Sequence, residues 1–107
     1  MELNQYQIVL VNLDPTIGSE IQKTRPCVII SPNEMNQFLR TVTIVPMTTS
    51  SRNYPTRVKV KHNGKEGWII LDQIRTIDKT RILKIFGSIT SKEIKACKNV
   101  IREIFVD

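Results

Sequence analysis

The chain has 107 residues, of which 40% are hydrophobic and 24% are charged, and its formal net charge is +6. No apolar run approaches the roughly 20 residues of a membrane-spanning helix, and the N-terminus lacks the basic and apolar segments of a secretory signal peptide. The length predicts a single domain over residues 1–107, with the cytoplasm as the expected compartment and no membrane partner.

Short apolar segments separated by turn residues predict a sheet of five or six strands. In the fourth segment, Val58 and Val60 alternate with basic residues, which gives that strand one apolar and one basic face. The Asn63-Gly64 pair predicts a tight hairpin between the fourth and fifth strands. The predicted strands cover residues 6–13, 26–31, 41–47, 56–61, 67–71 and 83–89.

One helix is predicted near the C-terminus. Thr90 and Glu93 have the spacing of a capping box. Single helical turns are expected over residues 33–38 and 78–83. These elements predict a mainly β (α+β) fold, a small, curled, antiparallel barrel on which the C-terminal helix packs. The apolar residues at helical spacing that would face the sheet are Ile94, Cys97, Ile101 and Ile104.

The positive charge is uneven along the chain. Residues 1–49 contain three basic and four acidic side chains, a net −1, so the remaining residues carry +7. This field favours a polyanion or an acidic protein as partner, although a solvated basic face is the alternative. Between positions 52 and 65 there are five basic residues and no acidic one: Arg52, Arg57, Lys59, Lys61 and Lys65.

The residue types that several catalytic sites require are missing. The single histidine, His62, excludes a two-histidine acid–base pair within one subunit, and beside a turn with lysines it is expected to be solvated. No cluster of His, Cys, Asp or Glu has metal-ligand spacing, so neither a metal nor another cofactor is expected. Cys27 and Cys97 are far apart and are expected to pack as reduced, hydrophobic thiols.

Two segments contain polar side chains that could act on a phosphate. The loop after the first strand carries Glu20, and Arg25 follows five residues later at the start of the next strand. The guanidinium fork suits phosphate, but the spacing by itself favours a surface ion pair between these two residues. The hydroxyl run from Thr48 to Ser51 could bind phosphate oxygens or close a loop by local hydrogen bonds.

The order and spacing of several motifs resemble those of the MazF/PemK toxin endoribonucleases over nearly the whole chain. Relatives often begin the first strand with Gly-Asp, where this chain has Tyr6 and Gln7. The matching pieces, in chain order, are residues 8–11, Leu13-Asp14-Pro15, Gly18-Ser19-Glu20, Arg25-Pro26, residues 28–31, Val45-Pro46-Met47-Thr48-Thr49, Tyr54-Pro55, residues 68–78 and the helix over residues 91–104.

This resemblance implies an SH3-like barrel of the CcdB/PemK type that forms a homodimer and is restrained by an acidic, MazE-like antitoxin. It also implies metal-independent, sequence-specific cleavage of single-stranded mRNA. The ribose 2′-hydroxyl attacks, and the products are a 2′,3′-cyclic phosphate and a 5′-hydroxyl. The implied catalytic residues are Arg25 and Thr48, with Glu20 in the same site. Substrate-binding candidates are Thr49, Gln73 and Arg75 from the resemblance, with Asp72 beside them, and Arg57, Lys59 and Lys61 from the basic face.

Two other functions fit the same fold. A CcdB-like poison that binds gyrase needs a partner surface and has no use for a Glu20–Arg25–Thr48 site. A nucleic-acid-binding barrel without chemistry would use the basic face of the fourth strand. A cleavage assay with purified protein and RNA separates the three functions.

Overall fold

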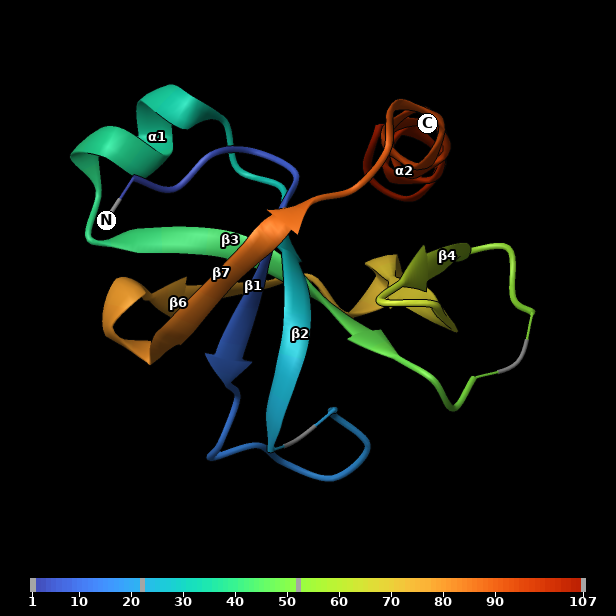
Figure 1. Ribbon diagram of the computed structural model, residues 1–107, viewed down its shortest axis with the longest axis horizontal. Helices are drawn as coiled ribbons and strands as arrows, with labels where there is room; N and C mark the ends of the chain where they lie inside the picture. The colour runs from blue at the N-terminus through green and yellow to red at the C-terminus, as the bar shows by residue number, and fades with distance from the viewer. Residues whose placement is uncertain (1, 22, 52, 107) are drawn as a thin grey trace.

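The computed structural model describes residues 2–21, 23–51 and 53–106, and Figure 1 shows the path of the chain. The strands are β1 (Gln7–Asn12), β2 (Thr24–Ile29), β3 (Thr41–Thr48), β4 (Arg57–His62), β5 (Lys65–Ile70), β6 (Arg75–Asp78) and β7 (Ile82–Ser88). The α-helices are α1 (Asn33–Phe38) and α2 (Ser91–Phe105), and the short 3₁₀ turns are η1 (Leu71–Gln73) and η2 (Lys79–Arg81).

The sheet is antiparallel and curls around its longest strand, β3. The strand order is β4-β5-β3-β2-β1-β7, and β6 also pairs with β3. Successive parts of β3 pair with different strands: residues 41–44 with β6, residues 44–46 with β2, and residues 47–48 with β5. The expected fold, a curled antiparallel sheet with a C-terminal helix, is therefore confirmed.

The sequence analysis missed one strand, β6. Only Ile77 of its four residues is buried, so the segment has too few apolar positions to show a strand pattern. The strand forms because four residues of β3 pair with it, from Thr41 with Asp78 to Ile44 with Arg75. The helical turns expected over residues 33–38 and 78–83 are present as α1 and η2.

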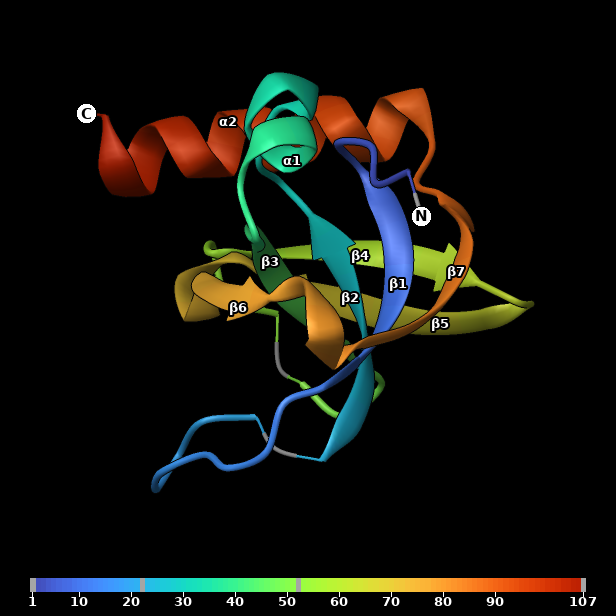
Figure 2. The same cartoon turned by 90° about the vertical axis from the view of Figure 1, so that its left-hand side faces the viewer.

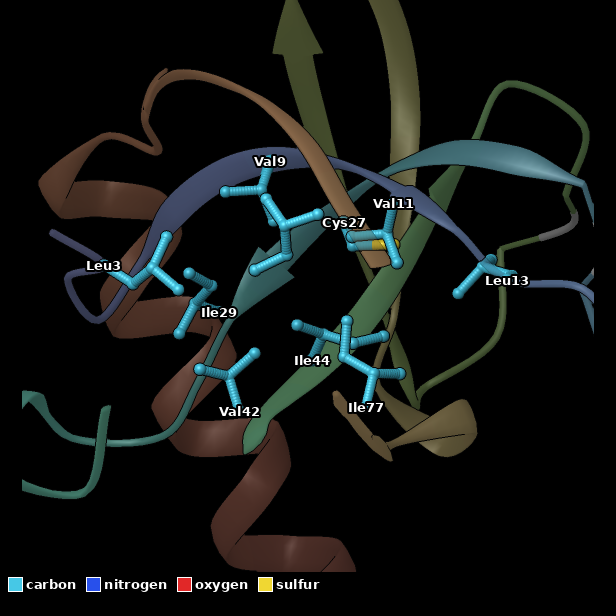
Figure 3. Close-up of a cluster of buried hydrophobic side chains, with 10 residues drawn as sticks. Leu3, Val9, Val11, Leu13, Cys27, Ile29, Val42, Ile44 and Ile77 are labelled. Atoms are coloured by element: carbon cyan, nitrogen blue, oxygen red, sulfur yellow. The ribbon is translucent and has the colours of Figure 1, made fainter. Parts of the chain in front are cut away.

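Neighbouring residues of the central strands alternate between two buried clusters, as the two-residue period of a strand requires. Val9 and Cys27 belong to the first cluster, which Figure 3 shows enclosed by β1, β2 and β3. Ile8 and Val28 belong to the second cluster, which continues onto β4 and α2. The two sets of side chains fix the strand registers, because a shift by one residue would exchange them.

Helix α2 covers the second cluster and lies across one end of the molecule in Figure 2. The capping box is present: Thr90 Oγ1 accepts a hydrogen bond from the Glu93 amide at 3.2 Å, and Glu93 Oε1 accepts one from the Thr90 amide at 2.8 Å. The predicted apolar face, from Ile94 to Ile104, packs on the cluster. Burial raises the pKa of the Cys27 and Cys97 thiols to about 12, so both side chains pack as hydrophobic groups.

The turn before β1 forms although the chain has Tyr6 where the proteins it resembles often have glycine. Tyr6 has a φ of 70°, in the left-handed region that favours glycine. Its amide donates a hydrogen bond to the Ile29 carbonyl at 2.6 Å, and its carbonyl accepts one from the Ile89 amide at 3.1 Å. Gln7 Oε1 also accepts a hydrogen bond from the Asn4 amide at 2.8 Å. These contacts hold the conformation that the missing glycine would adopt more easily.

Candidate functional site

The loop between β1 and β2 projects from the sheet on the side opposite α2 (Figures 1 and 2). Gly18 has a φ of 59° and supplies the tight turn at its tip. Glu20 closes this turn, because its Oε1 accepts the Ile17 amide at 2.6 Å while the Glu20 amide donates to the Ile17 carbonyl at 3.2 Å. The Glu20 carboxylate therefore has a structural partner within its own loop.

Side chains from η1, β6 and η2 hold the base of this loop. Arg75 Nη1 donates to the Leu13 carbonyl at 2.8 Å, and Gln73 Oε1 accepts from the Ile21 amide at 2.9 Å. Arg81, which the sequence analysis did not single out, donates to the Asp14 carbonyl at 2.7 Å. Gln73 and Arg75 were predicted to bind substrate, and that stays a prediction; their contacts within the chain hold the loop.

Arg25 and Thr48 meet at the open ends of neighbouring strands. The ladder between β2 and β3 ends at the Cys27–Pro46 pair, and Arg25 and Thr48 each lie two residues beyond it. Both residues line a cavity of about 220 Å³. The chain thus brings together a guanidinium and a hydroxyl that are far apart in sequence.

Glu20 lies in a different recess from these two residues. It lines a groove together with Pro46, Asp72, Gln73 and Arg75. Among the described residues the ion pairs are Arg57–Asp72 and Lys59–Glu66, and the expected pair between Glu20 and Arg25 is not one of them. Pro46 and Thr48 belong to the same strand end, so the groove adjoins the Arg25 cavity.

Thr48 is the member of the hydroxyl run that belongs to β3. It is half-buried, and its Oγ1 accepts a hydrogen bond from the Ser50 amide at 3.1 Å. With that acceptor site occupied, the Thr48 hydroxyl proton is available to donate. Thr49 lines the same cavity and is exposed, whereas Thr48 is half-buried.

The basic face of β4 is largely neutralised by carboxylates of the same molecule. Arg57 Nε lies 3.3 Å from Asp72 Oδ1, its Nη1 donates to Ser51 Oγ at 2.6 Å, and its guanidinium lies 4.8 Å from the centre of the Tyr54 ring. Burial tends to raise the pKa of Asp72, but hydrogen bonds from Arg57 and Thr56 outweigh it, so the net pKa of that carboxyl is lowered.

Lys59, like Arg57, lies beside a carboxylate and an aromatic ring. Its Nζ lies 3.1 Å from Glu66 Oε2 and 5.9 Å from the centre of the Trp68 ring. Lys61 remains exposed, and Arg52, the first residue of the basic run, lies outside the described residues. The sequence pattern identified the basic residues but could not show that Glu66 and Asp72 lie beside them.

The hairpin between β4 and β5 contributes His62, which the sequence analysis assigned to solvent, and two of its neighbours. His62 is half-buried, its ring contacts Phe86 edge-to-face with centroids 5.5 Å apart, and it lines the same cavity as Arg25. Asn63 and Lys65 line this cavity as well. The Asn63-Gly64 turn was the sequence signal that could have placed these residues side by side, since a tight turn brings its flanking residues together.

Within the described residues, no group of three or more His, Cys, Asp or Glu side chains is placed to hold a metal ion. The described helices include none that is long and apolar enough to cross a membrane.

Comparison with known proteins identifies relatives along most of the chain. A family model described as a PemK-like, MazF-like toxin of type II toxin–antitoxin system matches residues 4–105. Endoribonuclease MazF of Staphylococcus saprophyticus is 32% identical over 100 residues, which cover 88% of this chain and 83% of that protein. Endoribonuclease toxin MazF of Escherichia coli K12 is 36% identical over 70 residues, 65% of this chain and 63% of that protein.

Solved structures share the fold. MazF from Deinococcus radiodurans superimposes with a TM-score of 0.87 at 20% identity, covering 97% of this chain and 96% of that one. A mycobacterial endoribonuclease in complex with its cognate antitoxin gives a TM-score of 0.80 at 22% identity, covering 94% and 92% of the two chains.

Proposed function

The chain belongs to the family of PemK-like, MazF-like toxins of type II toxin–antitoxin systems, and we propose that Arg25 and Thr48 are the residues with which it cleaves RNA. As a member of this family the protein is an endoribonuclease toxin. The observation that carries the site assignment is that Arg25 and Thr48 line one cavity, which the ends of β2 and β3 form with the β4–β5 hairpin.

The proposed reaction uses a nucleophile that the RNA itself supplies. The ribose 2′-oxygen attacks the adjacent phosphorus and loses its proton to solvent. The bond from phosphorus to the 5′-oxygen breaks, and that oxygen takes up a proton. The products are a 2′,3′-cyclic phosphate and a 5′-hydroxyl end, with no metal required. The protein has to align the attack and stabilise the negative charge that develops on the phosphoryl oxygens.

Arg25 and Thr48 supply complementary parts of that stabilisation. The Arg25 guanidinium provides a permanent positive charge with donors in a fixed fork. Thr48 adds a neutral hydroxyl donor, which the Ser50 amide orients. Together they would donate to the non-bridging oxygens of one phosphate.

Glu20 is proposed to position Arg25 by holding the loop that precedes it. Its carboxylate closes the β1–β2 loop at Ile17, and Gln73 and Arg75 hold the base of the same loop. The loop leads directly into β2, so these residues would set the position from which Arg25 reaches the substrate.

A cleavage assay tests the function. Purified protein should cut single-stranded RNA in excess EDTA and leave cyclic phosphate ends that mass spectrometry detects. The same oligonucleotide with a single 2′-deoxy sugar at the cut site should remain intact. Cleavage at that deoxy position, or loss of activity with EDTA that added metal restores, would contradict the proposed chemistry.

We propose the cytoplasm as the compartment, a homodimer as the active form and an acidic antitoxin as the restraining partner. The net +7 over the second part of the chain offers such a partner a complementary field. A disordered acidic tail could fold across the Arg25 cavity and so exclude RNA.

Two measurements test these partners. Sedimentation equilibrium should give twice the mass of the chain. In a competition titration with non-cleavable RNA, saturating antitoxin should displace the RNA. A stable complex of all three molecules with unchanged RNA affinity would rule out direct occlusion.

A further inference from the structure

We propose that the β4–β5 hairpin and the end of β3 form a pocket for one base of the RNA, and that it selects a keto base, guanine or uracil. This inference rests on the proposed function, since it places the base beside the phosphate that Arg25 would hold. The pocket is the part of the 220 Å³ cavity that extends from Arg25 toward the hairpin.

The hairpin presents one face to this cavity. Val60 and His62 are two residues apart on β4, and the ladder pairs them with Gly67 and Lys65 on β5. Residues two apart on a strand share a face, and paired residues lie side by side on it. All four of these residues line the cavity, as the register requires.

The floor of the pocket is apolar and unobstructed. Met47 and Val60 are 6% and 4% exposed, and Pro26 lies beside them. Gly67 has no side chain, and a Cβ at this position would lie 3.1 Å from the Thr48 carbonyl oxygen. The glycine therefore lets β5 lie close against the end of β3.

This floor suits a flat ring better than a phosphate. An anion placed against Met47 and Val60 would lose hydration without gaining a partner, whereas a base has an apolar face. The His62 ring, which rests against Phe86, adds an aromatic surface of the kind on which unpaired RNA bases stack. One splayed nucleotide would thus place its phosphate at Arg25 and its base at the hairpin.

The rim of the pocket favours hydrogen-bond acceptors. Lys65 carries three donors and no acceptor, whereas the Asn63 amide beside it has both donors and an acceptor. The Asn63 Nδ2 also lies 3.4 Å from His62 Nε2, so the preference for acceptors rests on Lys65. The carboxylate on this rim, Glu66, accepts the Lys59 ammonium at 3.1 Å. Donors match the carbonyl edge of guanine, at O6 and N7, or of uracil, at O4, whereas adenine presents an amino group there.

Sequencing the ends produced from a random RNA pool tests this pocket. We compare the wild type with two variants, Lys65→Met, which keeps the aliphatic stem, and Asn63→Gly. Asn63 has a φ of 53°, which glycine adopts without strain. Lys98→Met is the matched control, because Lys98 is an exposed lysine on α2 outside this cavity.

At one position relative to the cut, the wild type should prefer G or U over A by about fivefold or more. Lys65→Met should remove most of that preference, Asn63→Gly should leave most of it in place, and both should keep the preferences at the other positions. Lys98→Met should match the wild type. A wild type that shows no preference for a keto base at any position, or a Lys65→Met profile identical to the wild-type profile, overturns the pocket.

A binding measurement separates this inference from the cleavage chemistry. Non-cleavable 2′-O-methyl oligonucleotides that differ at the one position are titrated against the same variants, with melting curves as a check on folding. Lys65→Met should reduce the difference in affinity between the keto and adenine oligonucleotides. Discrimination in binding without cleavage would contradict the proposed function alone, and cleavage with unaltered discrimination would contradict the pocket alone.

Discussion

The basic face of β4 and the cavity beside Arg25 carry the same kind of charge in different surroundings. On β4, Arg57 and Lys59 lie within 3.3 Å and 3.1 Å of the carboxylates of Asp72 and Glu66. At the cavity, Arg25 and Lys65 stand around an apolar floor with Thr48 between strand ends. On β4 the positive charges are paired with carboxylates of the same protein. At the cavity the positive charges surround a space that a ligand can enter.

This difference shows why a run of basic residues does not locate a binding site. Alternation along β4 follows from the sequence, but the partners of that face come from β5 and η1 and depend on the strand register. Surface ion pairs of this kind contribute about 0–1 kcal/mol. Their main effect here is to lower the field that β4 offers to RNA.

The largest expected effect is a difference in RNA cleavage rate between variants at the Arg25 cavity and variants on the basic face of β4. Arg25→Ala should lower the single-turnover cleavage rate about 10²–10³-fold, because it removes a charge-stabilising donor from the cavity. The melting temperature should stay near that of the wild type, since Arg25 lies at a strand end. The matched control on β4, Lys59→Ala, should keep a rate close to the wild type.

Near wild-type cleavage by Arg25→Ala with an unchanged melting curve would place the reaction elsewhere. A large loss of cleavage rate in Lys59→Ala would reverse the comparison, because it would show that the basic face of β4 is needed for cleavage.

A smaller effect should distinguish the two threonines at the end of β3. Thr48→Ala should slow cleavage about tenfold or more, because it removes the hydroxyl that the Ser50 amide orients. Thr49→Ala should change the rate by less, since Thr49 is exposed. Thr48→Ser keeps the hydroxyl and should retain most of the activity. The reverse order of the two alanine variants would assign the donor to Thr49.

The sequence predicted the fold well where one element carries its own pattern. The α2 helix needed only Thr90, Glu93 and the recurrence of apolar residues, and the hairpin needed only Asn63-Gly64. The β6 strand was missed because its pairing with β3, rather than its composition, makes it a strand.

In the site, too, the sequence did not reveal features that depend on contacts between distant segments. Arg25 and Thr48 were identified by resemblance, and the pairing of β2 with β3 brings the strand ends that carry them to one cavity. The role of Arg81 at the Asp14 carbonyl and the position of His62 depend on contacts between segments that are distant in sequence. Arg81 stands in no local pattern that could have revealed its contact, and the Asn63-Gly64 turn beside His62 gave no sign of Phe86.

The Arg57–Asp72 pair should make a modest, pH-dependent contribution to stability. Asp72→Asn should lower the free energy of unfolding by about 0.5–1 kcal/mol at neutral pH. The pKa of Asp72 is lower in the folded than in the unfolded state. Ionised Asp72 therefore stabilises the fold above its unfolded pKa, near 4, and this contribution disappears as the pH falls through the folded pKa.

Melting curves of the wild type and Asp72→Asn at a series of pH values provide the measurement. The difference in melting temperature should be constant from pH 8 to about pH 5 and should shrink below about pH 4. A difference that persists unchanged in acid would mean that the charge of Asp72 contributes nothing.

The smallest expected effect concerns the salt dependence of RNA binding. Each phosphate contact on a single strand contributes about −0.7 to the slope of log K against log salt. Lys59→Met/Glu66→Gln removes the ion pair without changing the net charge, so it should alter the slope by much less than 0.7 and stability by less than about 0.5 kcal/mol. Arg25→Met should reduce the slope by about 0.7 if its guanidinium contacts one phosphate. A loss of 0.7 or more in the double variant would show that Lys59 contacts RNA despite Glu66, and the distinction between the two regions would fail.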